Sequence, residues 1–401
     1  MTTETTGTAP VLRWRGGFGR LWSAAVVSRF GDALRGAALP LLAVRLTDSP
    51  LLVSLVAAAQ FLPWLLFGLL GGAVADRVDQ RRAMAAVDAV RAVLTAAFAV
   101  AVWAGEARIW LLLVLAFALT TLQTVFDNAA TALLPAVVPR ELLARANGRL
   151  LTGQEVAYRF VGGPLVPLLL GAGLALPYAV DAVSFALAAA LVAGVPTART
   201  PAPAGRTLRG DVAEGLRALW GDRTLRAVGV SAVVCNAAVG MVIGVLVVHI
   251  TGWLGAGATG YAVVLTAYGA GMVAAGPLAE RLGRIRALPA AIAAQAAALA
   301  VFGTVRSLPV AAVALAVFGF AGMLTMVVEV TVLQERAPAA LLGRVSAAFR
   351  TATIAGTPLG AVAAGGVAEL WPLNTPVLVA AVLMACGAVP LVVAARSIAR
   401  I

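Results

Sequence analysis

Three charged residues stand close together within a long apolar stretch near the start of the chain. Arg29, Asp32 and Arg35 are spaced three residues apart, so on a helix their side chains share one face. A charge at the centre of a bilayer costs about 2.5–3.5 kcal/mol on insertion scales, so such residues face a cavity or a partner. A carboxylate withdrawn from water can alternate between protonated and charged forms, which makes Asp32 a predicted proton or cation site. The same spacing also allows a permanent ion pair with Arg29 or Arg35.

Two further pairs of opposite charge lie within apolar stretches. Glu155 and Arg159 are four residues apart and can neutralise each other on one helix face. This spacing favours a structural or gating pair at the cavity over a substrate site. Asp88 and Arg91, three residues apart, are interpreted in the same way, and we expect them to be wetted from the cytosol.

Charged residues also recur at similar places in the two halves of the chain. Asp127 and Glu329 occupy such places, and Arg350 is available to pair with one of them. We expect these residues to latch the halves together on the cytosolic side, and breaking the ion pairs would open an inward gate. Polar and aromatic residues expected around an amphipathic cavity are Phe30, Gln60, Trp64, Gln123, Phe126, Asn128, Gln154, Tyr158, Asn236 and Tyr268.

The composition places these charges in a membrane protein. Hydrophobic residues make up 61% of the 401 residues and charged residues only 12%, which is too apolar for a soluble surface. Taking about 20 residues per span, the apolar runs predict an all-α protein of twelve transmembrane helices. They are expected near 21–46, 51–75, 83–104, 109–134, 150–172, 176–196, 225–251, 258–280, 287–305, 309–333, 344–368 and 374–396.

The arginines predict the orientation in the membrane. The chain has no Lys, and 22 of its 30 Arg fall in the termini and in every second loop. The remaining loops carry only Arg45, Arg108 and Arg306. Positive loops stay on the cytosolic side, so we expect a multi-pass protein of the cell membrane with both termini in the cytosol. The net charge of +12 is therefore interpreted as orientation in the bilayer and not as nucleic-acid binding.

The chain is also duplicated. Ala75, Asp76 and Arg77 match Ala279, Glu280 and Arg281 at an offset of 204, and a second loop repeats at an offset of 199. Parallel repeats of this kind predict two pseudo-symmetric six-helix bundles. The expected divisions are a tail at 1–20, a bundle at 21–196, a linker at 197–224, a second bundle at 225–396 and a tail at 397–401.

The first of these repeated loops resembles the signature loop of the major facilitator superfamily. Its pattern of a glycine, an Asp-Arg pair and two further arginines matches Gly72, Asp76, Arg77, Arg81 and Arg82. Segments such as Leu46-Thr47-Asp48-Ser49-Pro50 are similar to the drug:proton antiporter-type branch that contains enterobactin exporters and macrolide efflux pumps. The resemblance implies a cytosolic gate at these residues and at Glu280 and Arg281. It also implies export of a drug or siderophore driven by proton entry.

The resemblance has two gaps. Gly163 and Pro164 resemble the superfamily's antiporter motif in helix 5, but Pro167 and Leu168 replace its second pair of glycines. A superfamily arginine in the middle of helix 4 is also missing. The first gap weakens the inference of export, and the second removes any helix-4 arginine relay.

The sequence contains no pattern typical of an enzyme. One His gives no His-based metal cluster, and without Lys there is no phosphate loop, so we expect no metal, no cofactor and no nucleotide hydrolysis. Taken with the family resemblance, which implies proton-driven export, the sequence leads us to predict a monomeric transporter that exports an amphipathic small molecule against proton influx by alternating access. The alternatives are a proton-coupled uptake symporter, a lysolipid-type flippase, or, outside transport, a membrane scaffold or sensor.

Overall fold

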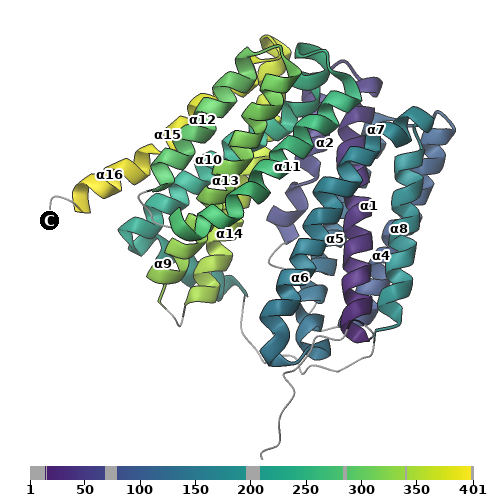
Figure 1. Cartoon of the computed structure of the whole chain (residues 1–401), viewed down its shortest axis with the longest axis horizontal. Coiled ribbons are helices and arrows are strands. Elements are labelled where there is room, and N and C mark those ends of the chain that lie inside the picture. The colour runs from purple at the N-terminus through teal and green to yellow at the C-terminus, as the bar shows by residue number, and fades with distance from the viewer. Residues whose placement is uncertain are drawn as a thin grey trace, which may run out of the picture.

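The protein is described by a computed structural model that covers residues 14, 16–67, 79–195, 208–282, 287–338 and 341–398. The described residues form helices and connecting turns without strands (Figure 1). The elements are α1 (Gly17–Leu46), α2 (Pro50–Ala59), α4 (Gln80–Trp103), α5 (Ile109–Val137), η1 (Arg140–Leu142), α6 (Leu143–Val156), η2 (Ala157–Gly162), α7 (Gly163–Ala172), α8 (Leu176–Ala193), α9 (Leu208–Gly221), α10 (Arg223–Val248), η3 (His249–Trp253), α11 (Gly257–Leu282), α12 (Leu288–Thr304), α13 (Leu308–Arg336), α14 (Leu342–Leu370), α15 (Thr375–Gly387) and α16 (Val389–Ile398).

Most of these helices are long and apolar enough to cross a bilayer. Within the described ranges nine segments meet this description: α2 with its continuation to Phe67, α4, α5, α8, α10 with η3, α11, α13, α14, and α15 with the start of α16. The predicted all-α membrane fold is thereby confirmed. The other three predicted spans correspond to α1 and α6–η2–α7, which carry charges, and to α12, which has 17 residues.

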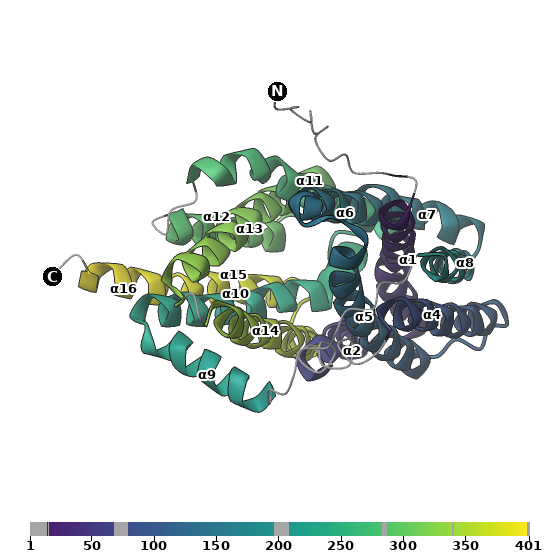
Figure 2. The ribbon, with the colours of Figure 1, turned by 90° about the horizontal axis from the view of Figure 1, so that it is seen from below.

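The helices form two bundles that lean together (Figures 1 and 2). Helices α1 to α8 make one bundle and α10 to α16 the other. The bundles touch where α2 packs on α10 and α14, and where α11 packs on η2 and α7. Helix α9 lies against α10 and α14, where Glu214 accepts a hydrogen bond from Arg344. The end at which α1 and α6 begin and α5 and α13 end is called the Arg-rich end.

Small residues set how closely the helices of the second bundle pack. A Cβ on Gly240 of α10 would lie 2.1 Å from the carbonyl oxygen of Thr357, and one on Gly360 of α14 would lie 1.9 Å from that of Ala237. The backbones of α10 and α14 are therefore in direct contact, as in other small-residue helix interfaces in membranes.

Several predicted spans have different bounds in the structure. The fifth begins at Leu143 rather than 150 and contains a π-helical turn, η2. The second is interrupted by a turn at Gln60 and Phe61, and the twelfth breaks between α15 and α16. Hydropathy alone misses such breaks because the residues on both sides remain apolar. The predicted bounds of the two tails, the bundles and the linker stay predictions.

Candidate functional site

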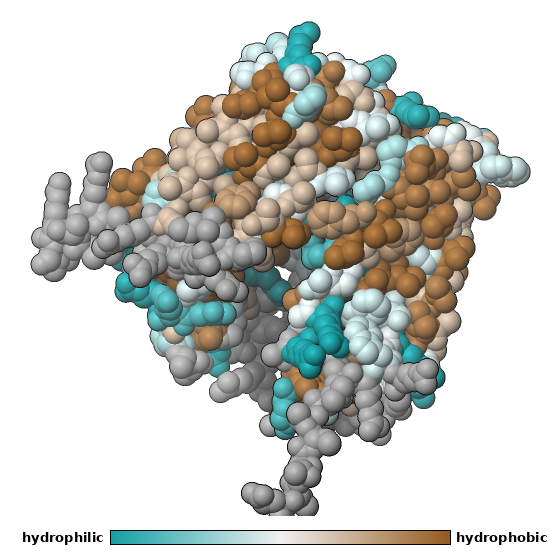
Figure 3. All heavy atoms as spheres, viewed as in Figure 1, coloured by the Kyte–Doolittle hydropathy of each residue, from teal (hydrophilic) through white to brown (hydrophobic). Residues whose placement is uncertain are grey.

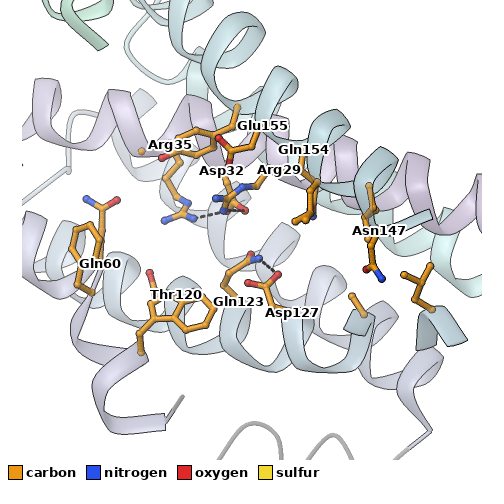
Figure 4. A pocket seen from close by; sticks show the side chains of 18 residues that line it. Arg29, Asp32, Arg35, Gln60, Thr120, Gln123, Asp127, Asn147, Gln154 and Glu155 are labelled. Atoms are coloured by element: carbon orange, nitrogen blue, oxygen red, sulfur yellow. Dashed lines mark hydrogen bonds and ion pairs between the residues drawn. The ribbon is translucent and has the colours of Figure 1, made fainter. Parts of the chain in front are cut away.

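A cavity of about 550 Å³ opens into the first bundle. Figure 3 shows the surface hollowed between the bundles toward the Arg-rich end, and Figure 4 shows side chains from α1 and α6 facing those from α5 across the cavity. The lining residues all come from the first half of the chain: Arg29, Asp32, Arg35, Gly36, Gln60, Phe61, Trp64, Thr120, Gln123, Asp127, Ala130, Leu134, Asn147, Leu150, Leu151, Gln154, Glu155 and Tyr158.

The lining includes five of the ten polar and aromatic residues expected there. They are Gln60, Trp64, Gln123, Gln154 and Tyr158. The cavity thus combines charged, amide and aromatic groups, which suits a ligand with both apolar and polar parts.

Asp32 lies where this cavity meets a buried ion network. Its Oδ1 atom is 2.6 Å from Arg35 Nη2 and 2.5 Å from Arg91 Nη2, and its Oδ2 atom is 3.9 Å from Arg29 Nη1. The predicted pairing of Asp32 with its neighbours on α1 is present, and a third arginine, from α4, joins it. The guanidinium of Arg29 also lies 4.6 Å above the ring of Tyr158.

The network continues away from the cavity through α4. Arg91 Nη1 donates to Asp88 Oδ1 at 3.0 Å and to Ser28 Oγ at 3.1 Å. The guanidinium of Arg91 also lies 3.8 Å from the ring centre of Phe185. The expectation that Asp88 and Arg91 are wetted from the cytosol is wrong, because both side chains are 0% exposed. Packing of α4 against α8 covers the helix face that carries them.

A third carboxylate, Asp181 on α8, completes the network. Its Oδ2 atom lies 3.6 Å from Arg35 Nε, and neither oxygen has a hydrogen-bond partner. Gly31 brings α8 this close to α1, since a Cβ there would lie 2.0 Å from Ser184 Oγ and 2.2 Å from Asp181 Oδ1. The sequence analysis missed Asp181. A lone acidic residue in an apolar stretch was the available signal.

The predicted pair in the fifth span is also formed. Glu155 Oε2 lies 2.5 Å from Arg159 Nε. Arg159 belongs to η2, and its guanidinium lies 5.5 Å from the ring centre of Tyr268 on α11 in the other bundle. A Cβ on Gly269 would lie 3.0 Å from Arg159 Cδ, so the side chain is fitted against α11. Arg159 therefore lies at the contact between the bundles. The gating role of the pair stays a prediction.

The three residues expected to latch the bundles lie on different elements. Asp127 on α5 accepts a hydrogen bond from Gln123 at 2.7 Å and lines the cavity. Glu329 on α13 is half-buried and Arg350 on α14 is exposed, and the described residues show no ion pair for either. Their role as a latch stays a prediction.

The residues that match the signature loop are only partly described. Arg81 Nη1 donates to the carbonyl oxygens of Ala193 and Val195 at 3.2 and 3.3 Å, which ties the start of α4 to the end of α8. Arg82 is exposed and lies 3.9 Å from Asp79. Gly72, Asp76 and Arg77 lie outside the described residues, and Glu280 and Arg281 belong to the last turn of α11 with side chains outside the description.

The helix-5 motif is placed at the junction of η2 and α7. Gly163 is the first residue of α7, and Pro164 follows in its first turn. The preceding Gly162 packs closely against α1, since a Cβ there would lie 2.5 Å from Ala33 Cβ and 3.0 Å from the carbonyl oxygen of Phe30.

The end opposite the Arg-rich end is closed by a contact that the sequence analysis also missed. Glu369, near the end of α14, accepts hydrogen bonds from the hydroxyl of Ser49 and from the backbone N–H of Leu51 at 3.2 Å. A carboxylate is favourable at a helix N-terminus because the first N–H groups are unpaired. The start of α2 and the end of α14 are thereby joined across the two bundles.

Two helical bundles, closed together at one end and enclosing a polar cavity within the bilayer, define a membrane transporter and not an enzyme. The family model described as Major Facilitator Superfamily matches residues 21–353, so the chain belongs to this superfamily. Over 158 residues the chain is 26% identical to macrolide efflux protein A of Streptococcus pyogenes, an alignment that covers 39% of this chain and 38% of that protein.

Solved structures share the fold over almost the whole chain. The nucleoside transporter NupG superposes with a TM-score of 0.72 at 15% identity, covering 94% of this chain and 98% of that one. A bacterial homologue of the human lysosomal transporter Spinster, in an inward-facing and unoccupied conformation, superposes with a TM-score of 0.67 at 16% identity, covering 95% and 96%. At these identities the likeness concerns the fold.

Proposed function

We propose that this chain exports an amphipathic small molecule from the cytosol by alternating access, driven by protons that enter in the opposite direction. The mixed polar and aromatic lining of the cavity supports a substrate of this class. The partial similarity to a macrolide efflux protein supports the direction of transport. In this proposal the Arg-rich end faces the cytosol, both termini lie on that side, and a single chain is the working unit.

The placement of Asp32 carries the proposal. Its carboxylate lines the cavity and also holds Arg35 and Arg91, which lead to α4 and α8. A proton that binds Asp32 removes the negative charge that these two guanidinium groups share. The arginines then lose their strongest partner, so protonation at the cavity changes the packing of α1 against its neighbours.

The closed and open ends suggest how access alternates. The contact of Glu369 with Ser49 and Leu51 holds the bundles together at the end away from the cytosol. In the opposite state this contact would break. The cytosolic gate would then form from Asp127, Glu329 and Arg350, together with the signature-loop residues.

Reconstituted liposomes test the proposal. A macrolide is placed on one side of the membrane and a pH-sensitive dye on the other. A pH gradient is imposed that drives protons into the liposomes. We expect macrolide movement coupled to proton movement in the opposite direction in the unchanged protein, and uncoupled movement in Asp32→Asn. Movement of both in one direction would identify a symporter. Translocation of a labelled lysolipid alone would identify a flippase. No movement of any tested compound would favour a scaffold or sensor.

A further inference from the structure

A second hollow lies on the outside of the first bundle, away from the cavity. This groove of about 680 Å³ runs between the start of α1 and the segment α6–η2, and its lining includes Trp14, Trp22, Arg145, Arg149, Val156 and Val161. It is named the Trp–Arg groove. None of these six residues lines the transport cavity.

The groove changes from basic to apolar along α6 and η2. Arg145 and Arg149 are on successive turns near the Arg-rich end, where Arg145 is exposed and Arg149 is half-buried. No acidic residue lines the groove, and the described residues show no ion pair for either arginine. Farther along, Val156 and Val161 are 47% and 49% exposed, which is a large apolar surface for residues beside a basic site.

Two tryptophans form the wall of the groove on the side of α1. The rings of Trp14 and Trp22 meet edge to face with centroids 5.2 Å apart, and the guanidinium of Arg149 lies 5.1 Å from the ring of Trp14. Trp22 Nε1 donates to the carbonyl oxygen of Arg149 at 2.9 Å. A Cβ on Gly153 would lie 2.8 Å from Trp22, so the indole packs directly on α6. The wall is therefore held by specific contacts.

We propose that the Trp–Arg groove is a binding site for an anionic phospholipid. The phosphate pairs with Arg145 and Arg149, whose guanidinium groups match a phosphate in geometry and charge. The tryptophans lie at the level of the headgroups, where indole rings are favoured. One acyl chain then follows Val156 and Val161 toward the centre of the bilayer, where burying the chain removes apolar surface from the groove.

The groove is connected to the transport cavity through α6, because one face of this helix lines the cavity and another face lines the groove. Asn147, Leu150 and Gln154 line the cavity, whereas Arg145 and Arg149 line the groove. A lipid in the groove therefore binds the outer face of the helix whose inner face contacts the substrate space. The site is defined by the groove alone and does not depend on the direction of transport or on proton coupling.

Native mass spectrometry of the full chain in detergent tests the proposal. Phosphatidylglycerol or phosphatidylcholine with the same acyl chains is titrated in, and bound lipid is counted. We expect phosphatidylglycerol to bind preferentially and Arg145→Gln with Arg149→Gln to weaken its binding roughly tenfold. The matched control, Arg217→Gln with Arg223→Gln, removes the same charge from exposed positions in α9 and α10 and should keep the unchanged affinity.

A steric variant separates the groove from charge alone. Gly148 lines the groove, and a Cβ there would have no atom within 4 Å, so Gly148→Phe fills the space and keeps both arginines. We expect this variant to lose phosphatidylglycerol as well, and free glycerol 3-phosphate not to compete. Equal binding of both lipids, equal loss in the control, or full binding by Gly148→Phe would each overturn the proposal.

Discussion

Arg91 Nη2 and Asp32 Oδ1 are 2.5 Å apart, although the two residues are separated by 59 positions in the sequence. The contact joins α4 to α1 inside the bilayer. Arg91 also donates hydrogen bonds to Asp88 and Ser28. The positive charge of one guanidinium group is thus shared by two carboxylates, those of Asp32 and Asp88. Buried charges of this kind are costly unless every partner is present.

Removing Arg91 should therefore destabilise the fold strongly. Arg91→Gln leaves the buried carboxylates of Asp32 and Asp88 short of positive charge, and we expect a loss of about 3–5 kcal/mol in the free energy of unfolding. Chemical unfolding in detergent measures this loss. The control Arg108→Gln breaks an exposed pair with Glu106, 3.6 Å away, and should cost less than about 1 kcal/mol. Equal losses in the two variants would contradict the network.

The double variant Arg91→Gln with Asp88→Asn, measured beside each single variant, refines this test. It removes one positive and one negative charge, so the net charge of the buried network does not change. We expect it to be more stable than Arg91→Gln alone. An additive loss from the two substitutions would show that Asp88 and Arg91 do not interact energetically.

Replacing Asp32 and replacing Asp181 with asparagine should lower the free energy of unfolding by different amounts. Asp32→Asn removes the shared partner of Arg35 and Arg91, whereas Asp181 has one cation, 3.6 Å away, and no hydrogen bond. We expect Asp32→Asn to cost about 3 kcal/mol or more and Asp181→Asn less than about 1.5 kcal/mol. Thermal unfolding of the two variants side by side gives the order. A greater loss for Asp181→Asn would mean that Asp181 is better compensated than its contacts indicate.

The sequence predicts well what lies along a single helix. Spacing places Arg29, Asp32 and Arg35 on one face, and it pairs Glu155 with Arg159. Hydropathy predicts the membrane class because each span must bury its own backbone in lipid. Both inferences need only the local period of the helix.

Contacts between helices could not be predicted in this way. Spacing says nothing about which face of α4 or α8 meets α1, so the joining of Arg91 and Asp181 to Asp32 was missed. The π-helical turn η2 was missed as well, because one extra residue in a helical turn leaves no hydropathy signal. Glu369 lies at the end of its helix, where an acidic residue ordinarily faces water.

The two neighbouring arginines that match the signature loop should behave differently. Arg81 donates to two carbonyl oxygens at the end of α8, where unpaired carbonyls and the helix dipole favour a cation. We expect Arg81→Gln to lower the free energy of unfolding by about 1 kcal/mol. Arg82 is 81% exposed, and Arg82→Gln should stay within about 0.5 kcal/mol of the unchanged protein. Indistinguishable unfolding curves would assign Arg81 no role in holding α4 to α8.

Two adjacent glycines at the closed end offer a test of how the bundles meet. A Cβ on Gly365 would lie 1.9 Å from Ser54 Oγ and 2.9 Å from Leu51 Cα, whereas one on Gly366 would have no atom within 4 Å. Gly365→Leu must therefore push α14 away from α2 and favour opening at this end. Gly366→Leu adds the same side chain without a clash.

Spin labels at Asp48→Cys and Leu370→Cys, both exposed near this contact, report the separation. The labels are introduced with Cys235 and Cys386 replaced by Ser, so that only the intended thiols react. We expect Gly365→Leu to shift the distance distribution to longer values and Gly366→Leu to leave it unchanged. The shift should appear without any substrate, because the clash acts on the closed state directly. Equal distributions in the two variants would mean that the packing of α2 on α14 does not hold this end closed.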